Sequence, residues 1–171
     1  MEVLDYHIKD KIGEGGFSEV FRAEKNGRDF AIKILRVPDG IAAEDVLSRM
    51  RYEFWVLKDL DHPHIVKVHD FGCLQDGRIF LVENFIAGLT LRNFCAQHPF
   101  PACEPALLGV LRGLKSLHEW NIVHGDLKIE NILVAEEEND AIAKILDFGL
   151  ARSLITPQSP LTSEGFSGTP A

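Results

Sequence analysis

The sequence predicts an α+β fold that begins with an antiparallel sheet and continues as a mostly helical half. Two observations support this prediction. Up to residue 82, short runs rich in β-branched and aromatic residues are separated by turn residues, as in hairpins. After Gly88, apolar residues recur at every third or fourth position, as on the buried face of a helix.

The first half is expected to contain strands over residues 6–12, 19–23, 29–35, 65–70 and 78–82. A glycine-rich turn at 13–16 and the hairpin dipeptide Asn26-Gly27 separate the first three strands. A helix is expected over 42–60, where apolar residues recur at helical spacing. Glu53 is the odd member of that apolar stripe, and His62-Pro63 ends the helix.

The second half is expected to contain a short helix over 90–97 and a longer one over 104–120. The leucines of the longer helix cover more than one narrow stripe, which predicts burial on more than one side. Two strands are expected over 131–135 and 142–146, and the tail from Ser153 has the composition of a loop.

Length, charge and cysteine content limit the classes of function. The 171 residues fit one domain or a large part of one. The net charge of -8 argues against a general nucleic-acid or anionic-membrane binder. No apolar run approaches the roughly 18 residues of a membrane helix, and residues 1–13 do not resemble a signal peptide. Because the 3 cysteines have no metal-binding spacing, reduced thiols and a cytoplasmic location are expected.

The run Gly13-Glu14-Gly15-Gly16-Phe17-Ser18 lies between two expected strands. This position argues against Rossmann and Walker sites, because both bind phosphate at the N-terminus of a helix. A glycine-rich hairpin can instead fold over phosphates and donate backbone N–H groups to them. A plain turn is the alternative, since glycine marks turns of many kinds.

Lys33 is a charged residue in a strand of alanine, isoleucine and phenylalanine. One interpretation is an exposed lysine on an edge strand. The other is a phosphate-binding lysine held by a carboxylate. Glu53 is the candidate carboxylate, because a charge on a buried helix face is costly unless it is paired.

Charged and polar residues crowd positions 124–131, immediately before an expected strand. Asp126 is suited to orient an attacking hydroxyl group or accept its proton, and Lys128 to lie beside a transferred phosphoryl group. Asn131 and Asp147 are expected at neighbouring strand ends, where two oxygen ligands suit Mg²⁺ bound together with substrate phosphates. For each residue alone a solvated surface position is the alternative, but their order together favours phosphoryl transfer.

These motifs together resemble those of the eukaryotic-type Ser/Thr protein kinases, from Ile12 to the last residue. The resemblance depends on Gly13-x-Gly15 with Val20, Ala31-Ile32-Lys33, Glu53, His62-Pro63-His64-Ile65-Val66, His124-x-Asp126-Leu127-Lys128-x-x-Asn131, Asp147-Phe148-Gly149 and Gly168-Thr169-Pro170. It implies a protein-kinase-like fold. A complete N-lobe over 1–84 would hold a five-stranded antiparallel sheet and the helix at 42–60. A partial C-lobe would cover 85–171, and the ending is most like that of bacterial members.

The resemblance also implies an ATP-dependent enzyme that uses Mg²⁺ and phosphorylates a protein Ser/Thr hydroxyl. Asp126 would be the catalytic base beside Lys128, and Glu53 would pair with Lys33. Asn131 and Asp147 would hold Mg²⁺. The nucleotide would contact Ile12, Gly13, Gly15, Val20, Ala31, Lys33, Asn84, Phe85, Ile86 and Leu133, of which 84–86 correspond to the hinge.

Two positions depart from the family pattern. Gly125 stands where the family usually has an arginine that binds a phosphorylated activation loop, so phosphate is not expected to order residues 153–169 in that way. The residue behind the adenine is Glu83 if one counts back from Gly88, and Val82 if the alignment slips by one. Glu83 is favoured, although strand alternation is only a moderate guide to register.

Two alternatives to a protein kinase follow from the same motifs. Small-molecule phosphotransferases of the aminoglycoside and choline kind share His-Gly-Asp, usually with histidine where this chain has Lys128. The family also continues beyond the position of Ala171, so a truncated fragment that only binds nucleotide is the second alternative. Truncation is expected to impair transfer and to expose the leucine-rich helix at 104–120 to self-association.

Overall fold

The computed structural model describes residues 2–15, 18–35, 44, 47–48, 51, 54–55, 57–137, 140–148 and 152–153. The chain divides into two compact units. The first unit comprises Met1–Asp61 and Val66–Ala87, and the second comprises His62–Ile65 and Gly88–Ala171. The boundary between the two units falls after Ala87, three residues beyond the expected boundary after residue 84. The segment His62–Ile65 belongs to the second unit although it precedes this boundary.

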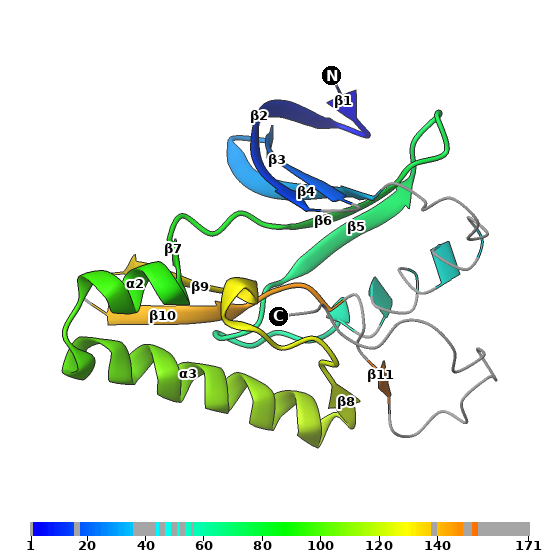
Figure 1. Ribbon diagram of the computed structural model, residues 1–171. Coiled ribbons are helices and arrows are strands. Elements are labelled where there is room, and N and C mark those ends of the chain that lie inside the picture. Colours follow the sequence, from blue (N-terminus) through cyan, green and yellow to red (C-terminus); the bar gives the residue numbers. More distant parts are fainter. Residues whose placement is uncertain are drawn as a thin grey trace. The chain divides into compact units, whose positions relative to one another are not determined.

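The first unit contains an antiparallel sheet of 6 strands in the order β1-β2-β3-β4-β6-β5 (Figure 1). These strands are β1 (Glu2–Val3), β2 (Tyr6–Gly15), β3 (Ser18–Lys25), β4 (Arg28–Leu35), β5 (Val68–Cys73) and β6 (Ile79–Asn84). The expected sheet of five strands is confirmed, and β1 is a sixth strand that was not predicted. A strand of 2 residues carries no periodicity, and β1 pairs with β2 through a turn in which Leu4 has φ 52°.

The predicted hairpin at Asn26-Gly27 is confirmed. The two residues have φ values of 54° and 75°, and Lys25 pairs with Arg28 on either side of them. A two-residue turn with both φ values positive matches the twist of the flanking strands, which explains why asparagine and glycine occupy it.

The register of the sheet separates its two faces. Cross-strand partners lie on the same face of a sheet, and successive residues lie on opposite faces. One face holds a buried cluster of Val3, Tyr6, Ala23, Phe30, Ile32, Ile34, Phe80 and Val82. The opposite face carries Val20 and Lys33, which pair with each other, and Ala31 and Glu83, which also pair.

The helix expected over 42–60 lies largely outside the described residues, and Glu53 is among those outside. The described positions 44, 47, 48, 51, 54, 55 and 57 are all helical. The Lys58 N–H donates to the Phe54 carbonyl at 2.8 Å, which is the spacing of an α-helix. Strand β5 begins at Val68, later than expected, and Ile65 instead forms a single parallel bridge with Ile145.

The second unit contains two helices and several short strands. In chain order the elements are β7 (Leu89–Thr90), α2 (Leu91–Gln97), α3 (Phe100–Glu119), β8 (Ile122–Val123), η1 (Ile129–Asn131), β9 (Ile132–Glu137), β10 (Asp140–Ile145) and β11 (Arg152–Ser153). The two expected strands are β9 and β10. They pair with each other, and β7 joins them in a sheet of the order β10-β9-β7. The expected loop character of the tail is wrong at Ser153, because β11 pairs with β8.

Both expected helices are present. The Thr90 hydroxyl accepts a hydrogen bond from the Asn93 N–H at 3.3 Å and caps α2, which ends before His98. Helix α3 begins at Phe100, four residues before the predicted start at 104. The prolines near its beginning concealed this start, although proline is well tolerated in the first turn of a helix.

Helix α3 is buried along one stripe. Its buried residues include Cys103, Ala106, Val110, Gly113 and Leu117, which recur every three or four positions. The prediction of burial on more than one side is therefore wrong. Leu108 and Leu111 lie on another face, with 43% and 61% of their surface exposed, so the expected leucine-rich surface is confirmed.

Candidate active site

His124 organises the segment that follows β8. Its ring is buried, with 3% of the residue exposed, and the Asp126 N–H donates to its Nδ1 at 3.3 Å. Nε2 lies 2.9 Å from the Leu146 carbonyl and must donate to it, so the hydrogen-bond pattern assigns the Nε2–H tautomer. Burial lowers the pKa of His124, which favours this neutral form.

Asp126, Lys128 and Asn131 form one cluster, as their spacing predicted. Lys128 Nζ lies 3.0 Å from Asp126 Oδ2. Asn131 Nδ2 donates to the Asp126 carbonyl at 3.1 Å, and the Asn131 N–H donates to the Lys128 carbonyl at 3.0 Å. These bonds fold the loop so that the carboxylate, the ammonium group and the amide come from a stretch of six residues.

Asp147 lies beside this cluster because β9 and β10 are antiparallel. Ile132 at the start of β9 pairs with Ile145 at the end of β10, and the Leu146 N–H donates to the Asn131 carbonyl at 2.8 Å. Asp147 follows at once, with φ 58°. The expectation that Asn131 and Asp147 stand at neighbouring strand ends is confirmed.

The residues at these strand ends have the chemistry of a magnesium site. Mg²⁺ prefers oxygen ligands and usually keeps water or phosphate as the others, so an amide and a carboxylate suffice. The Asn131 hydrogen bond uses Nδ2, which leaves Oδ1 as the atom suited to a cation. Among the described residues there is no cluster of three or more His, Cys, Asp or Glu side chains that could hold a metal ion.

Gly125 and Phe148, which are next to Asp126 and Asp147 in the sequence, have backbone or packing constraints. Gly125 has φ 83°, in the left-handed region that favours glycine, which gives a local reason for glycine between His124 and Asp126. Phe148 is fully buried, and its ring centroid lies 4.6 Å from that of His124. The segment before β9, which contains His124, therefore packs against the segment after β10, which contains Phe148.

Apart from Leu133, the other expected site residues belong to the first unit. Gly13 pairs with Val20 and Gly15 with Ser18 in the β2–β3 hairpin, while Gly16 and Phe17 lie outside the described residues. Lys33 lies half-buried in β4, between β3 and β6, so the alternative of an edge-strand lysine is wrong.

The residues expected to form the hinge, 84–86, begin at the last residue of β6. The Asn84 N–H donates to the Lys67 carbonyl at 2.9 Å, and its Oδ1 lies 2.6 Å from His69 Nε2. Phe85 and Ile86 are in neither helix nor strand, and the Arg22 guanidinium lies 4.8 Å from the centre of the Phe85 ring. Neither His69 nor Arg22 was predicted from the sequence to be a site residue. The position of Arg22 inside the predicted strand 19–23 is the feature of the sequence that could have marked it as a candidate.

The predicted site residues thus fall into two groups. The second unit brings together Asp126, Lys128, Asn131 and Asp147, and it also contains the half-buried Leu133. The first unit places Val20, Ala31 and Lys33 on one sheet face. Ile12, Gly13 and Gly15 lie in β2, Asn84 ends β6, and residues 85–86 follow directly after it. Glu53, the expected partner of Lys33, lies outside the described residues.

Comparison with known proteins gives consistent results. Residues 6–171 match the family described as the protein kinase domain. The chain is 34% identical to the serine/threonine-protein kinase pkn3 of Myxococcus xanthus, over 96% of this chain and 32% of that protein. It is 32% identical to the probable serine/threonine-protein kinase PknB of Bifidobacterium longum, over 96% of this chain and 25% of that protein.

The similarity extends beyond bacteria. The serine/threonine-protein kinase ATG1a of Arabidopsis thaliana is 31% identical over 98% of this chain and 27% of its own length. The chain therefore spans about a third or less of each of these relatives. Because the family match covers nearly all of the sequence and includes the motifs around Lys33, Asp126 and Asp147, the chain belongs to the protein kinase domain family.

Proposed function

We propose that the chain transfers the γ-phosphoryl group of ATP to a serine or threonine hydroxyl group of a protein. The arrangement of Asp126, Lys128 and Asn131 next to Asp147 is the observation that supports this most strongly. The names of the relatives as serine/threonine-protein kinases support the same reaction and the protein substrate.

Each side chain of the cluster has a role in the proposed transfer. The substrate oxygen attacks the γ-phosphorus, the bond to the bridging oxygen breaks, and ADP leaves. The proton of the hydroxyl group passes to the Asp126 carboxylate. Lys128, held 3.0 Å from that carboxylate, stabilises negative charge on the phosphoryl oxygens. Lys128 is the residue that favours a protein hydroxyl as the acceptor over a small molecule.

Asn131 and Asp147 are proposed to hold Mg²⁺. The bound metal ion would neutralise charge on the ATP phosphates. The Asn131 bond to the Asp126 carbonyl orients the amide, and the pairing of β9 with β10 keeps Asp147 next to it. The same pair of strands therefore positions the proposed metal ligands and the proposed base.

The first unit is proposed to bind the nucleotide. The β2–β3 hairpin with Gly13 and Gly15 would cover the phosphates, and Lys33, paired with Glu53, would contact the α- and β-phosphates. Ile12, Val20, Ala31 and Leu133 would contact the adenine, with backbone groups of residues 84–86. Glu83, which pairs with Ala31, is proposed as the residue behind the base, because Val82 faces the buried cluster instead.

The test is transfer of radioactive phosphate from [γ-³²P]ATP, in Mg²⁺, to the chain itself and to a basic protein. The Asp126→Asn variant is expected to lower the rate by about 10²–10⁴-fold, the usual contribution of a general base. Asp140→Asn, an exposed carboxylate in β10, is the matched control and should keep the wild-type rate.

Other outcomes would redirect the proposal. Phosphate transferred to an aminoglycoside or to choline, and to no protein, would support the small-molecule phosphotransferase. ATP binding without any transfer would support a non-catalytic nucleotide-binding protein. Equal rates in wild type and Asp126→Asn would contradict the role of this carboxylate.

A cytoplasmic location and self-association are also proposed. The cysteines Cys73, Cys95 and Cys103 are all free thiols, as expected for a reducing compartment. No helix among the described residues has the length and apolar character needed to cross a membrane. The exposed Leu108 and Leu111 of α3 offer an apolar surface for a second copy of the chain.

A further inference from the structure

Arg22 is a charged residue within a sheet strand, and the proposed reaction gives it no role. It pairs with Asp10 of β2 on one side and with Ala31 of β4 on the other. These pairings place it on the sheet face that also carries Val20 and Lys33. The arginine therefore belongs to the surface proposed to bind the nucleotide.

Two carboxylates and a lysine fix the position of the Arg22 side chain. Its Nη2 donates to Asp29 Oδ2, and Lys9 Nζ donates to Asp29 Oδ1 at 2.9 Å. The hydrogen bonds from Arg22 and Lys9 lower the pKa of Asp29 to about 2, so this carboxylate is charged at neutral pH. Asp10 adds a further favourable charge interaction from the neighbouring strand.

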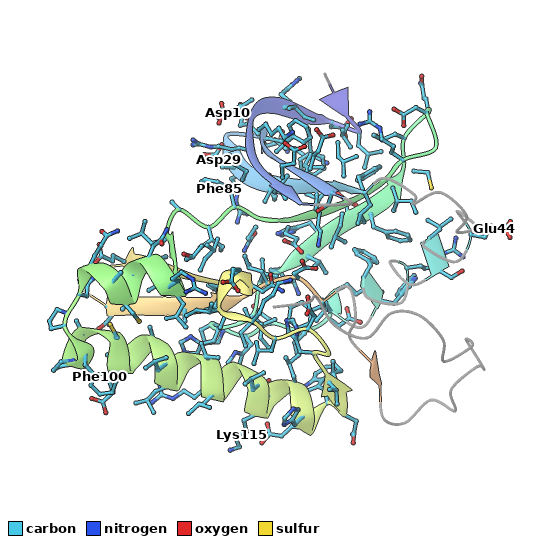
Figure 2. The ribbon with its side chains drawn as sticks, in the orientation of Figure 1. Asp10, Asp29, Glu44, Phe85, Phe100 and Lys115 are labelled. Carbon is cyan, nitrogen blue, oxygen red and sulfur yellow. The ribbon has the colours of Figure 1, made fainter. Side chains whose placement is uncertain are left out.

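The anchored guanidinium group contacts the hinge. Its central carbon lies 4.8 Å from the centre of the Phe85 ring, within the range of a cation–π interaction. Figure 2 shows Asp10, Asp29 and Phe85 close together at one end of the sheet of the first unit. Phe85 is the first residue after β6, so the strand pairing that holds Asn84 does not continue to it.

The other side of the hinge is held by a separate contact. His69 of β5 lies 2.6 Å from the Asn84 side-chain oxygen, and the His69 ring packs edge-on against Phe30 with centroids 5.1 Å apart. Side chains from β5 and β3 thus contact consecutive hinge residues. A loop whose backbone groups are already oriented loses less entropy when a ligand binds to it.

We propose that Arg22 is a positioning residue that holds Phe85, and with it the backbone of residues 84–86, in the orientation that binds adenine. This inference rests on the proposed nucleotide site. It predicts that Arg22 affects binding of the base and leaves binding of the phosphates unchanged, because its side chain contacts Asp29 and Phe85, neither of which is proposed to bind phosphate.

The experiment is calorimetric titration of the 171-residue chain with Mg-ATP, with adenosine and with inorganic tripolyphosphate. Arg22→Met, which removes the charge and keeps the length, should weaken adenosine and ATP binding by about three- to tenfold. Tripolyphosphate binding should stay within twofold of wild type. Arg22→Lys, which keeps a cation, should restore part of the loss.

A double-mutant cycle isolates the contact. Phe85→Leu alone should weaken adenosine binding as Arg22→Met does. The double variant should bind adenosine no more weakly than either single variant, because both substitutions remove the same interaction. Arg28→Met, an exposed arginine at the start of β4, is the matched control and should bind all three ligands normally. Thermal melting of each variant monitors the fold.

The outcomes separate this inference from the proposed function. If wild type binds ATP and Arg22→Met binds adenosine equally well, the positioning role is wrong and the kinase proposal stands. Equal weakening of adenosine and tripolyphosphate would show a general effect on the fold and would also overturn the positioning role. A wild-type chain that binds none of the three ligands would overturn both proposals.

Discussion

Single side chains in this chain are positioned by contacts with residues far away in the sequence. His124 is the clearest case, because one ring nitrogen accepts from the Asp126 N–H while the other donates to the Leu146 carbonyl. The neutral histidine thereby links the segment with the proposed base to the segment with Asp147. A charged imidazolium would have no acceptor nitrogen for Asp126, so protonation breaks this connection.

The stability of the protein should therefore depend on the charge of His124. Burial lowers the pKa of His124 in the folded state, so the unfolded chain takes up a proton at a higher pH than the folded chain. The stabilising effect is present above the unfolded pKa near 6.5 and is lost as pH falls toward the folded pKa. Burial also lowers the pKa of His62, which acts in the same direction.

Urea denaturation at a series of pH values from 7.5 to 5 tests this expectation. The free energy of unfolding should fall as the pH decreases, by up to about 1.4 kcal/mol per pH unit for each histidine involved. His124→Phe should reduce the dependence of the unfolding free energy on pH, and the dependence that remains should come from His62. His118→Gln, at an exposed site in α3, is the control, and a His124→Phe slope equal to wild type would contradict the prediction.

Among the elements, α3 shows how close packing limits the choice of residue. A methyl group added at Gly109 would come within 2.6 Å of the His64 ring. That ring is itself held by a contact of 2.9 Å between Nδ1 and the Ala143 carbonyl of β10. The helix can therefore approach the segment His62–Ile65 this closely because residue 109 has no side chain. Figure 1 shows α3 running along β10 in the same unit.

Gly109→Ala should destabilise the protein. Alanine favours a helix over glycine by roughly 1 kcal/mol, but overpacking a close contact costs about 1–3 kcal/mol, and the His64 ring is not free to move. We expect a net loss of about 1 kcal/mol, measured as the free energy of unfolding in urea. Leu111→Ala, at a site with 61% exposure, should change it by less than about 0.5 kcal/mol. Increased stability of Gly109→Ala would contradict the clash.

For the whole molecule, the exposed surface of α3 has consequences for association. Leu108 and Leu111 are separated by three positions and lie on one helix face with Lys115, which Figure 2 labels. Apolar side chains gathered on a helix surface favour contact with another chain. Asp126 and its neighbours lie outside this helix, in the segment between β8 and β9.

The double variant Leu108→Lys/Leu111→Lys should therefore self-associate less than wild type at the same concentration. Sedimentation velocity across a range of protein concentrations measures this directly. Lys115→Ser changes a charge on the same face without removing apolar surface and should behave as wild type. Equal sedimentation of the double variant and wild type would show that this face does not mediate association.

Much of the fold and most of the site could be predicted from local sequence. The hairpin at Asn26-Gly27, the two helices and the strand pair β9–β10 depend on short-range spacing and turn chemistry, which are visible in one stretch of chain. The same holds for the cluster of Asp126, Lys128 and Asn131, whose members are close because the loop between them is short. Strands of 2 residues such as β1 and β11 could not be predicted, because they carry no periodicity.

The family, the order of the longer helices and strands, and the proposed base and metal ligands could be inferred from the sequence alone. The three-dimensional structure was needed to show that Glu83 shares a sheet face with Ala31 and Lys33 while Val82 joins the buried cluster. It was also needed to show that Arg22 contacts Phe85 and that α3 is buried along one stripe. These features depend on strand register and on packing between distant segments, and local spacing carries no information about which segments meet.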